Sequence, residues 1–174
     1  MLRALLMERF KLATHLEDRP IPAYTLVAVQ PKLQKANPAN RTRWKEGPPP
    51  DGKDPRNSSP ILSRLITCQN MTMAQLAEDL PRFAGGYLHT PVEDATGLAG
   101  AWDFTLSFTP AGQLGPGRGG DPAQASGVPT ASDPTGAVSL FDALTKQLGL
   151  KLELRKRVMP VLVIDHVEEK PTDN

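Results

Sequence analysis

Apolar residues recur along the chain at the spacings that are typical of helices and strands. The clearest helical pattern covers residues 73–84, where apolar side chains return at positions i, i+3, i+4 and i+7. Thr72, with Gln75 three residues later, predicts a capping box at the start of this helix. Pro81 removes a backbone donor inside the pattern, so we expect the helix to kink or end near Leu80.

Two further helices are predicted on the same grounds. One covers residues 140–148, with Ser139 as its N-cap and Gly149 as its C-terminal stop. The other begins at Leu2, where no Ser, Thr, Asp or Asn precedes the apolar pattern to cap the free amide groups. We therefore expect that the chain is a fragment, or that its true start lies upstream together with any targeting signal.

Strand-like runs follow each predicted helix. Residues 150–155 alternate between apolar and charged, and residues 161–164 are continuously apolar, which predicts a one-faced strand and a central strand joined by a hairpin turn. Residues 102–108 place four large side chains on one face of a strand, and residues 23–29 form the corresponding run after the first helix. Residues 61–68 predict one more strand, ahead of the second helix.

The first two stretches also share polar residues at nearly the same offsets. Arg9-Phe10, His15 and Glu17-Asp18 recur as Arg82-Phe83, His89 and Glu93-Asp94. The third stretch keeps only the apolar pattern. It is therefore either a diverged copy or a segment that shares only the same order of helix and strands. Because one helix and two strands cannot bury their own apolar surface, the three copies must pack together.

These patterns divide the chain into three units and two loops. The units are residues 1–30, 61–109 and 139–170; residues 31–60 are rich in proline and residues 110–138 in glycine and proline. Neither connecting segment has an apolar periodicity, so we expect two long disordered loops.

The predicted fold is α+β, in which antiparallel strands of the helix–strand–strand units form one or two sheets with the helices packed on one face. The predicted core consists of the large apolar residues of these patterns: Leu2, Leu5, Leu6, Phe10, Leu26, Leu76, Leu80, Phe83, Trp102, Phe104, Leu106, Leu140, Phe141, Leu144, Leu148, Leu152, Val161 and Val163.

Composition and charge exclude some classes of protein but indicate no particular function. The formal net charge is +1, so no global field favours nucleic acid or an anionic membrane. No apolar run approaches the length of about 18 residues that a transmembrane helix needs. Cys68 is the single cysteine, which excludes an internal disulfide and leaves the redox compartment undecided.

Histidine and carboxylate side chains are the candidates for metal binding. The set consists of His15, His89 and His166, with Cys68 and the carboxylates Glu17, Asp18, Glu93, Asp94, Asp165 and Glu168 nearby in sequence. None of them has the spacing of metal ligands. The three histidines could converge only if the copies were arranged about a common axis; otherwise they face solvent.

Catalytic candidates are weaker still. Cys68 lies in a strand pattern without a base or a helix N-terminus to lower its pKa, which is typical of a structural thiol. The paired carboxylates Glu17-Asp18 and Glu93-Asp94 are adjacent on strands, so they point to opposite faces and cannot act on one bond. We therefore assign no catalytic, cofactor-binding or metal-binding residue, and no cofactor.

The last candidate binding segments are one glycine-rich segment and two basic clusters. Residues 115–120 contain four glycines but lack the strand, the helix and the lysine of a phosphate-binding loop, so we interpret them as a linker. Arg41, Arg43 and Lys45 surround Trp44, a mixture also found in single-stranded nucleic-acid binders, but the cluster is short and lies among prolines. Residues 155–157 are basic and lie at the predicted hairpin turn. We interpret both clusters as solvated and predict no nucleic-acid partner.

Several segments together resemble a large family of uncharacterised proteins from soil acidobacteria. They are LRALLMERFKL at 2–12, PAYTLV at 22–27, NMTMAQLA at 70–77, TGLAGAWDFTL at 96–106, SLFDALTKQLGLKLE at 139–153 and VIDHVE at 163–168. Members of that family usually have a signal peptide, which implies a periplasmic or secreted protein; a genuine start at Met1 would instead imply a cytoplasmic one. Some resemble domains joined to membrane metallopeptidases of the antibiotic-sensor type. The third unit is also similar to the short N-terminal docking domain of secretins and TonB-dependent receptors.

The resemblance implies a docking role and no catalytic residue. Our leading hypothesis is a non-catalytic module of the bacterial cell envelope that binds another protein, through a strand edge offered to an extended peptide. The alternative is a regulatory or accessory domain of a metallopeptidase or hydrolase system, which convergence of the three histidines would favour. The sequence leaves the oligomeric state open.

Overall fold

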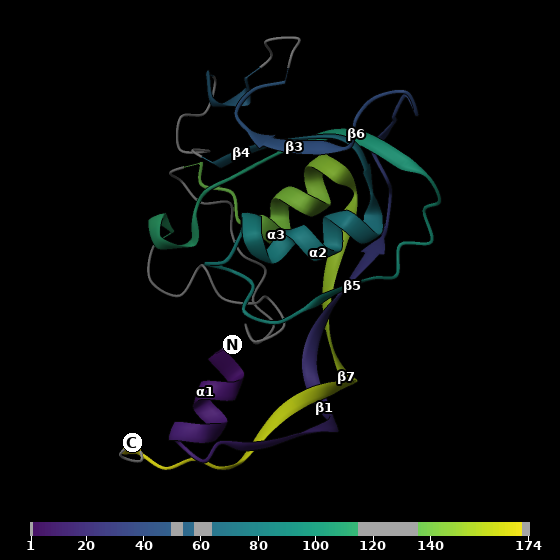
Figure 1. Ribbon diagram of the computed structural model, residues 1–174. Helices are drawn as coiled ribbons and strands as arrows, with labels where there is room; N and C mark the ends of the chain where they lie inside the picture. Colours follow the sequence, from purple (N-terminus) through teal and green to yellow (C-terminus); the bar gives the residue numbers. More distant parts are fainter. Residues whose placement is uncertain (1, 50–53, 58–63, 115–135, 172–174) are drawn as a thin grey trace. The chain divides into compact units, whose positions relative to one another are not determined.

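The computed structural model describes residues 2–49, 54–57, 64–114 and 136–171, and it confirms a mixed α+β protein (Figure 1). In chain order the elements are α1 (Leu2–Arg9), β1 (Ala13–Ala28), β2 (Gln34–Lys35), β3 (Arg43–Glu46), η1 (Pro55–Asn57), β4 (Arg64–Thr72), α2 (Met73–Phe83), β5 (Val92–Asp94), β6 (Ala101–Phe108), η2 (Ala111–Gln113), α3 (Leu140–Ala143), η3 (Leu144–Leu148) and β7 (Leu150–His166). The chain divides into two compact units. Unit 1 comprises Met1–Pro22 and Lys156–Asn174, and unit 2 comprises Ala23–Arg155.

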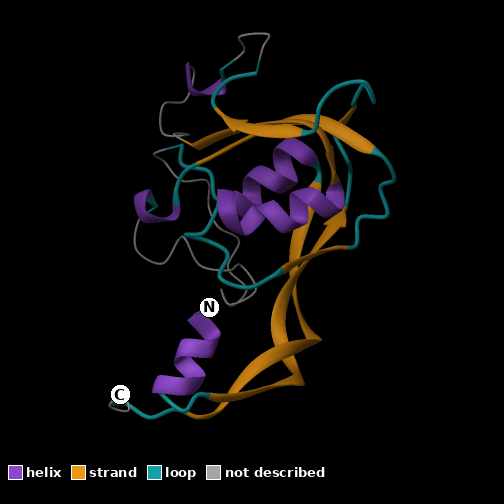
Figure 2. Ribbon diagram, viewed as in Figure 1, coloured by secondary structure: helices purple, strands orange, loops and turns teal. Residues whose placement is uncertain are grey.

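The main sheet of unit 2 is antiparallel, with strand order β2-β6-β4-β3 (Figure 2). Ile66 and Cys68 of β4 and Leu106 of β6 belong to the buried core, where helices α2 and α3 cover this face of the sheet. Because side chains alternate along a strand, the intervening residues Thr67 and Thr105, which pair across β4 and β6, belong to the opposite face.

Helix α2 begins as the sequence predicts. The Thr72 hydroxyl accepts a hydrogen bond from the Gln75 backbone N–H at 3.2 Å, and the Gln75 side-chain oxygen accepts one from the Thr72 backbone N–H at 3.0 Å. An end at Leu80 is wrong, because the helix continues through Pro81 to Phe83; the alternative of a kink stays a prediction. Pro81 lies in the last turn, and the Ala84 N–H still donates to the Leu80 carbonyl at 3.0 Å, so one missing donor does not end the helix.

The predicted helix at 140–148 is also present, as α3 followed by the π-helical turn η3. The Ser139 side chain caps it by accepting from the Asp142 N–H at 3.1 Å. Gly149 ends it in the left-handed region at φ 67°, as predicted from its position.

A second sheet has three strands in the order β5-β1-β7. β1 and β5 are parallel, with Tyr24 opposite Val92. β7 runs antiparallel to β1, since the Gly149 carbonyl accepts from the Val29 N–H at one end and Asp165 contacts His15 at the other.

The structure does not confirm the repeated helix–strand–strand units. β1 and β7 are each one strand where the sequence interpretation expected two. In particular, residues 155–157 continue β7 and make no hairpin turn. They contain no Gly, Asn, Asp or Pro, the residues that tight turns need.

Most of the predicted core is buried. Leu26, Leu76, Leu80, Phe83, Phe104, Leu106, Leu140, Leu144, Leu148 and Leu152 belong to one cluster, and Trp102 and Phe141 pack against it half-buried. The predicted core residues of unit 1 are less buried. Leu5 is 51% exposed, Leu6, Phe10, Val161 and Val163 are only half-buried, and the Leu2 side chain lies outside the described part.

The predicted disordered loops are not confirmed. Within 31–60, β2 pairs with β6 and β3 pairs with β4, with Trp44 opposite Cys68, so this stretch contributes two strands to the main sheet. Within 110–138, η2 covers Ala111–Gln113, and residues 115–135, with the glycine-rich segment at 115–120, lie outside the described residues.

Candidate functional site

The first histidine belongs to an exposed ion pair in unit 1. His15 Nδ1 lies 2.8 Å from Asp165 Oδ1, and His15 Nε2 lies 3.8 Å from Glu17 Oε2. The hydrogen bond and the charge of Asp165 raise the pKa of His15 above its ordinary value. The pair therefore joins β1 to β7.

The other candidate metal ligands are not brought together. His166 lies 4.0 Å from Glu168, and His89 belongs to unit 2, in the turn between α2 and β5. Among the described residues, no group of three or more His, Cys, Asp or Glu side chains could hold a metal ion. The alternative function therefore gains no support from this geometry.

Cys68 is a core residue. Only 2% of its surface is exposed, and burial raises the pKa of its thiol to about 12. A thiol with this pKa is protonated at neutral pH and is a poor nucleophile.

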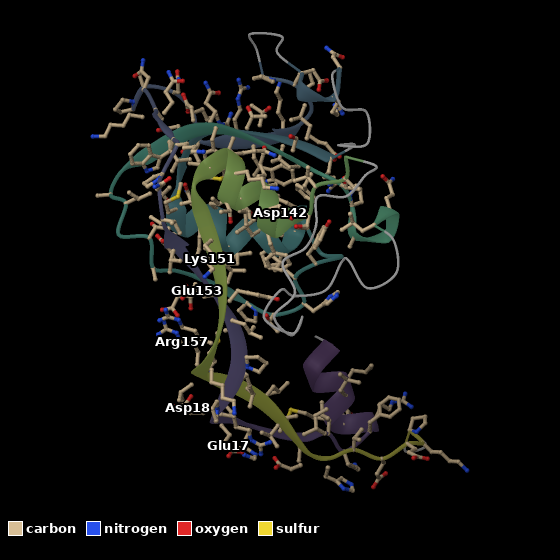
Figure 3. The ribbon with its side chains drawn as sticks, turned by 180° about the vertical axis from the view of Figure 1, so that it is seen from behind. Glu17, Asp18, Asp142, Lys151, Glu153 and Arg157 are labelled. Atoms are coloured by element: carbon tan, nitrogen blue, oxygen red, sulfur yellow. The ribbon has the colours of Figure 1, made fainter. Side chains whose placement is uncertain are left out.

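The paired carboxylates take part in local contacts. Glu17 Oε2 lies 2.6 Å from Arg19 Nη2, whose hydrogen bond lowers the pKa of Glu17, and Figure 3 shows Glu17 and Asp18 on β1. Asp94 Oδ1 accepts from the Thr96 backbone N–H at 2.8 Å and so closes the turn after β5. These contacts account for Glu17 and Asp94 without any catalytic role.

The basic cluster around Trp44 does not lie in a loop. Arg43, Trp44 and Lys45 belong to β3, and the Trp44 ring packs edge-on against Phe83 of α2, with 4.7 Å between centroids. Because neighbouring side chains alternate, Arg43 and Lys45 share the other face of the strand. The second cluster also belongs to a strand: Arg155 Nη2 lies 2.6 Å from Glu153 Oε2, and Figure 3 shows Lys151 and Glu153 along β7.

Unit 1 exposes large apolar side chains. Of nine exposed large hydrophobic residues in the described chain, only Val29 and Trp44 belong to unit 2. The four on the strands of unit 1 are Leu16 of β1 and Val158, Leu162 and Ile164 of β7, which are 71%, 70%, 64% and 59% exposed. We call these four residues the apolar strand face.

The ion pair shows that these four side chains share one side of the two-stranded ribbon. His15 and Asp165 contact each other, so their side chains lie on the same face. Their neighbours Leu16 and Ile164 therefore lie on the opposite face, and Leu162 and Val158 follow Ile164 at even spacings along β7. The described chain leaves this face open.

Prolines limit the hydrogen-bonding capacity of both outer edges of the ribbon to particular stretches. Tyr24 of β1 donates its N–H outward, to Pro91, so residues at even spacings before it face the same edge. Two of these are Pro22 and Pro20, which have no N–H to donate. β7 is the last strand of its sheet, and after Pro160 it has no further proline. The edge at 161–166 can therefore accept another strand.

A cavity with polar and charged side chains in its lining lies on the sheet of unit 2. Its volume is about 330 Å³, and it is lined from all four strands, by Gln34 of β2, Arg43 and Lys45 of β3, Thr67 and Gln69 of β4, and Asp103 and Thr105 of β6. Arg43 Nε donates to the Gln69 side-chain oxygen at 2.9 Å. The cavity is independent of the apolar strand face.

Residues 1–167 match a protein-family model that is described as Protein of unknown function (DUF3738). The chain belongs to this family. Family membership agrees with the resemblance to uncharacterised proteins, while the soil acidobacterial origin and the likeness to secretin and TonB-receptor domains stay predictions. No curated protein and no solved structure matches this DUF3738 chain. In its described part, no helix is long and apolar enough to cross a membrane.

Sequence reasoning missed both surfaces of this DUF3738 member. The run at 161–164 was interpreted as a buried central strand, and periodicity alone cannot distinguish a buried strand from an exposed one. For the cavity a signal was present: in the segment Arg43-Trp44-Lys45 two cations alternate with an aromatic residue, which is the pattern of a strand with one polar and one apolar face.

Proposed function

We propose that this DUF3738 chain is a non-catalytic docking module that binds an extended segment of another protein along the edge of β7. The observation that carries the proposal is the apolar strand face next to an edge with free backbone groups. An added strand would satisfy those groups, and its alternate side chains would cover Leu162 and Ile164.

The size of the apolar face favours a strand over a flat partner surface. Burying a large aliphatic side chain contributes about 1.5–3 kcal/mol, so four that are about two-thirds exposed contribute roughly 4–8 kcal/mol. Association costs an estimated 4–15 kcal/mol in lost freedom, so side-chain burial alone leaves little net affinity. Backbone hydrogen bonds along an added strand supply the remainder.

The expected partner segment has a defined chemistry. It is extended, it places apolar residues at every second position, and it has no proline among the residues that pair with 161–166. A second copy of the chain would present β7 itself, which has Pro160 in its middle and the basic Arg155 and Lys156 before it. Two antiparallel copies of this edge would pair over the same stretch, 161–166, so a second copy is the competing occupant that the test must distinguish.

A place in the bacterial cell envelope is part of the proposal and rests on the family resemblance alone. Fractionation of cells that express the gene with its native upstream sequence tests it. Recovery in the periplasm or medium is expected, and recovery in the cytoplasm would contradict the location without bearing on the docking edge.

Selection from a displayed library of random ten-residue peptides tests the docking edge. Wild-type protein should enrich peptides with alternating apolar residues, and the double variant Leu162→Lys, Ile164→Lys should not. Val29→Lys is the control, because it also places a lysine at an exposed apolar residue, but in unit 2, and it should leave the enrichment unchanged.

Two results would oppose the proposal. Equal enrichment by wild type and the double variant would remove the β7 edge as the binding site. A concentration-dependent dimer in light scattering, abolished by the same double variant, would show that a second copy occupies the edge. Circular dichroism of each variant establishes that a lost signal does not come from unfolding.

A further inference from the structure

The cavity of unit 2 has the character of a small-ligand site, with a mixed polar and apolar lining. Its volume of about 330 Å³ lies within the range of small-molecule pockets, which is roughly 300–1,000 Å³. It lies on the sheet face opposite the core, and Thr67 and Thr105 stand side by side in its middle as a cross-strand pair. Their neighbours Cys68 and Phe104 point into the core and fix the two strands.

Two cations define one end of the cavity. Arg43 and Lys45 lie two residues apart on β3, so their side chains share the cavity face. The bond from Arg43 Nε to Gln69 uses one of the five guanidinium donors and orients the group, which leaves its terminal N–H groups for a ligand. Among the described residues, Lys45 has no ion-pair partner.

A carboxylate lies at the other end. Asp103 Oδ1 accepts the Asn70 backbone N–H at 2.7 Å, which holds the side chain in place at the bulge of β4. In the described chain its second oxygen has no hydrogen-bond partner. Strand β4 separates β3 from β6, so the backbones that carry the cations and Asp103 are about two strand spacings, roughly 10 Å, apart.

We propose that this cavity binds a small organic carboxylate that also carries a hydrogen-bond donor, such as the free C-terminal end of a short peptide. Arg43 and Lys45 receive the carboxylate, because a guanidinium fork matches two carboxylate oxygens. Asp103 accepts the ammonium or hydroxyl hydrogen at the far end, and Thr67 and Thr105 lie between. The site is separate from the docking edge of unit 1, so either proposal can fail alone.

Titration with dialanine, followed by amide chemical shifts in NMR spectra, tests the site. Saturable shifts are expected at residues of β3, β4 and β6. Arg43→Gln should weaken binding about tenfold or more, since a charge-assisted hydrogen bond is lost. Lys35→Gln is the matched control: it removes the same charge from β2, and Lys35 alternates with Gln34, so its side chain belongs to the other face.

The other probes decide the ligand class. Dialanine amide, which lacks the carboxylate, should bind at least about tenfold more weakly than dialanine. Asp103→Asn should weaken the binding of dialanine but not the binding of acetate, because acetate has no hydrogen-bond donor. Absence of saturable shifts with dialanine would overturn the proposal, as would equal losses in Arg43→Gln and Lys35→Gln, or saturable binding of inorganic phosphate without binding of any carboxylate.

Discussion

Replacing Gly149 by alanine tests the contact between the end of η3 and the residues that directly follow strand β1. The Gly149 carbonyl accepts hydrogen bonds from the N–H groups of Val29 at 2.9 Å and Gln30 at 3.0 Å. A β-carbon at Gly149 would lie 1.6 Å from the Gln30 carbonyl oxygen and 2.3 Å from its carbon. Both are backbone atoms, so no side-chain rotation can relieve the overlap.

Two effects add in the expected loss of stability. The left-handed conformation, with φ at 67°, costs an alanine about 1–2 kcal/mol. Relief of the overlap must also displace the Gln30 backbone and break the two hydrogen bonds to Gly149, at about 0.5–1.5 kcal/mol each. We therefore expect Gly149→Ala to lower the free energy of unfolding by about 2–5 kcal/mol, out of the 5–15 kcal/mol typical of a folded protein.

Gly97→Ala is the matched control. Gly97 has φ at 68°, nearly the same as Gly149, but a β-carbon there would meet nothing within 4 Å. This variant should lose only about 1–2 kcal/mol, the cost of the conformation itself. Urea unfolding followed by tryptophan fluorescence measures both variants. Equal losses would refute the reasoning, because the clash with Gln30 would then contribute nothing.

Three further predictions concern single side chains. Phe104→Ala removes a buried ring of β6 and should lower the free energy of unfolding by about 3–5 kcal/mol; a variant that melts like the wild type would contradict its place in the core. Thr72→Ala removes the N-cap of α2 and should cost about 0.5–2 kcal/mol in the same urea assay, whereas Thr72→Ser keeps the acceptor oxygen and should cost less. Because Asp165 raises the pKa of His15, their pair stabilises the fold below pH 6.5 and this contribution is lost as the pH rises through the raised pKa. An NMR titration should give His15 a pKa above 6.5 in the wild type and a lower one in Asp165→Asn; one value for both would show that the pair does not form in solution.

Local sequence determines the parts of the fold that were predicted best. The capping box at Thr72 and the stop at Gly149 each depend on residues within one helical turn, so the chain reveals them without knowledge of the tertiary structure. The alternation at 102–108 likewise identified the strand β6 and its buried face. These elements pack together in unit 2, where most of the predicted core was found.

The errors arose where pairing partners are distant in sequence. β3 is a strand because it pairs with β4, about twenty residues later, and the prolines on either side of it and its own charges obscured that from the sequence. The length of β7 was missed because β1 supports it from the opposite end of the chain. The apolar residues at 150–154 and at 161–164 resembled two short strands, because basic residues at 155–157 interrupt the apolar pattern. These basic residues lack the conformational preferences of a turn.

The candidate surfaces were harder to predict than the fold, and the apolar strand face shows why. Apolar residues at 161–164 are compatible with a core strand or with a surface that a partner covers, and only the position of the strand at the edge of a sheet distinguishes the two. Exposed apolar edges promote aggregation, and proteins commonly protect them with proline. In unit 1, prolines remove donors from both strands, at Pro20 and Pro22 of β1 and at Pro160 of β7, and the part of β7 from Val161 to His166 is free of proline. The stretch from Val161 to His166 thus combines an edge position with exposed apolar side chains, which is the combination expected where a partner strand covers a surface.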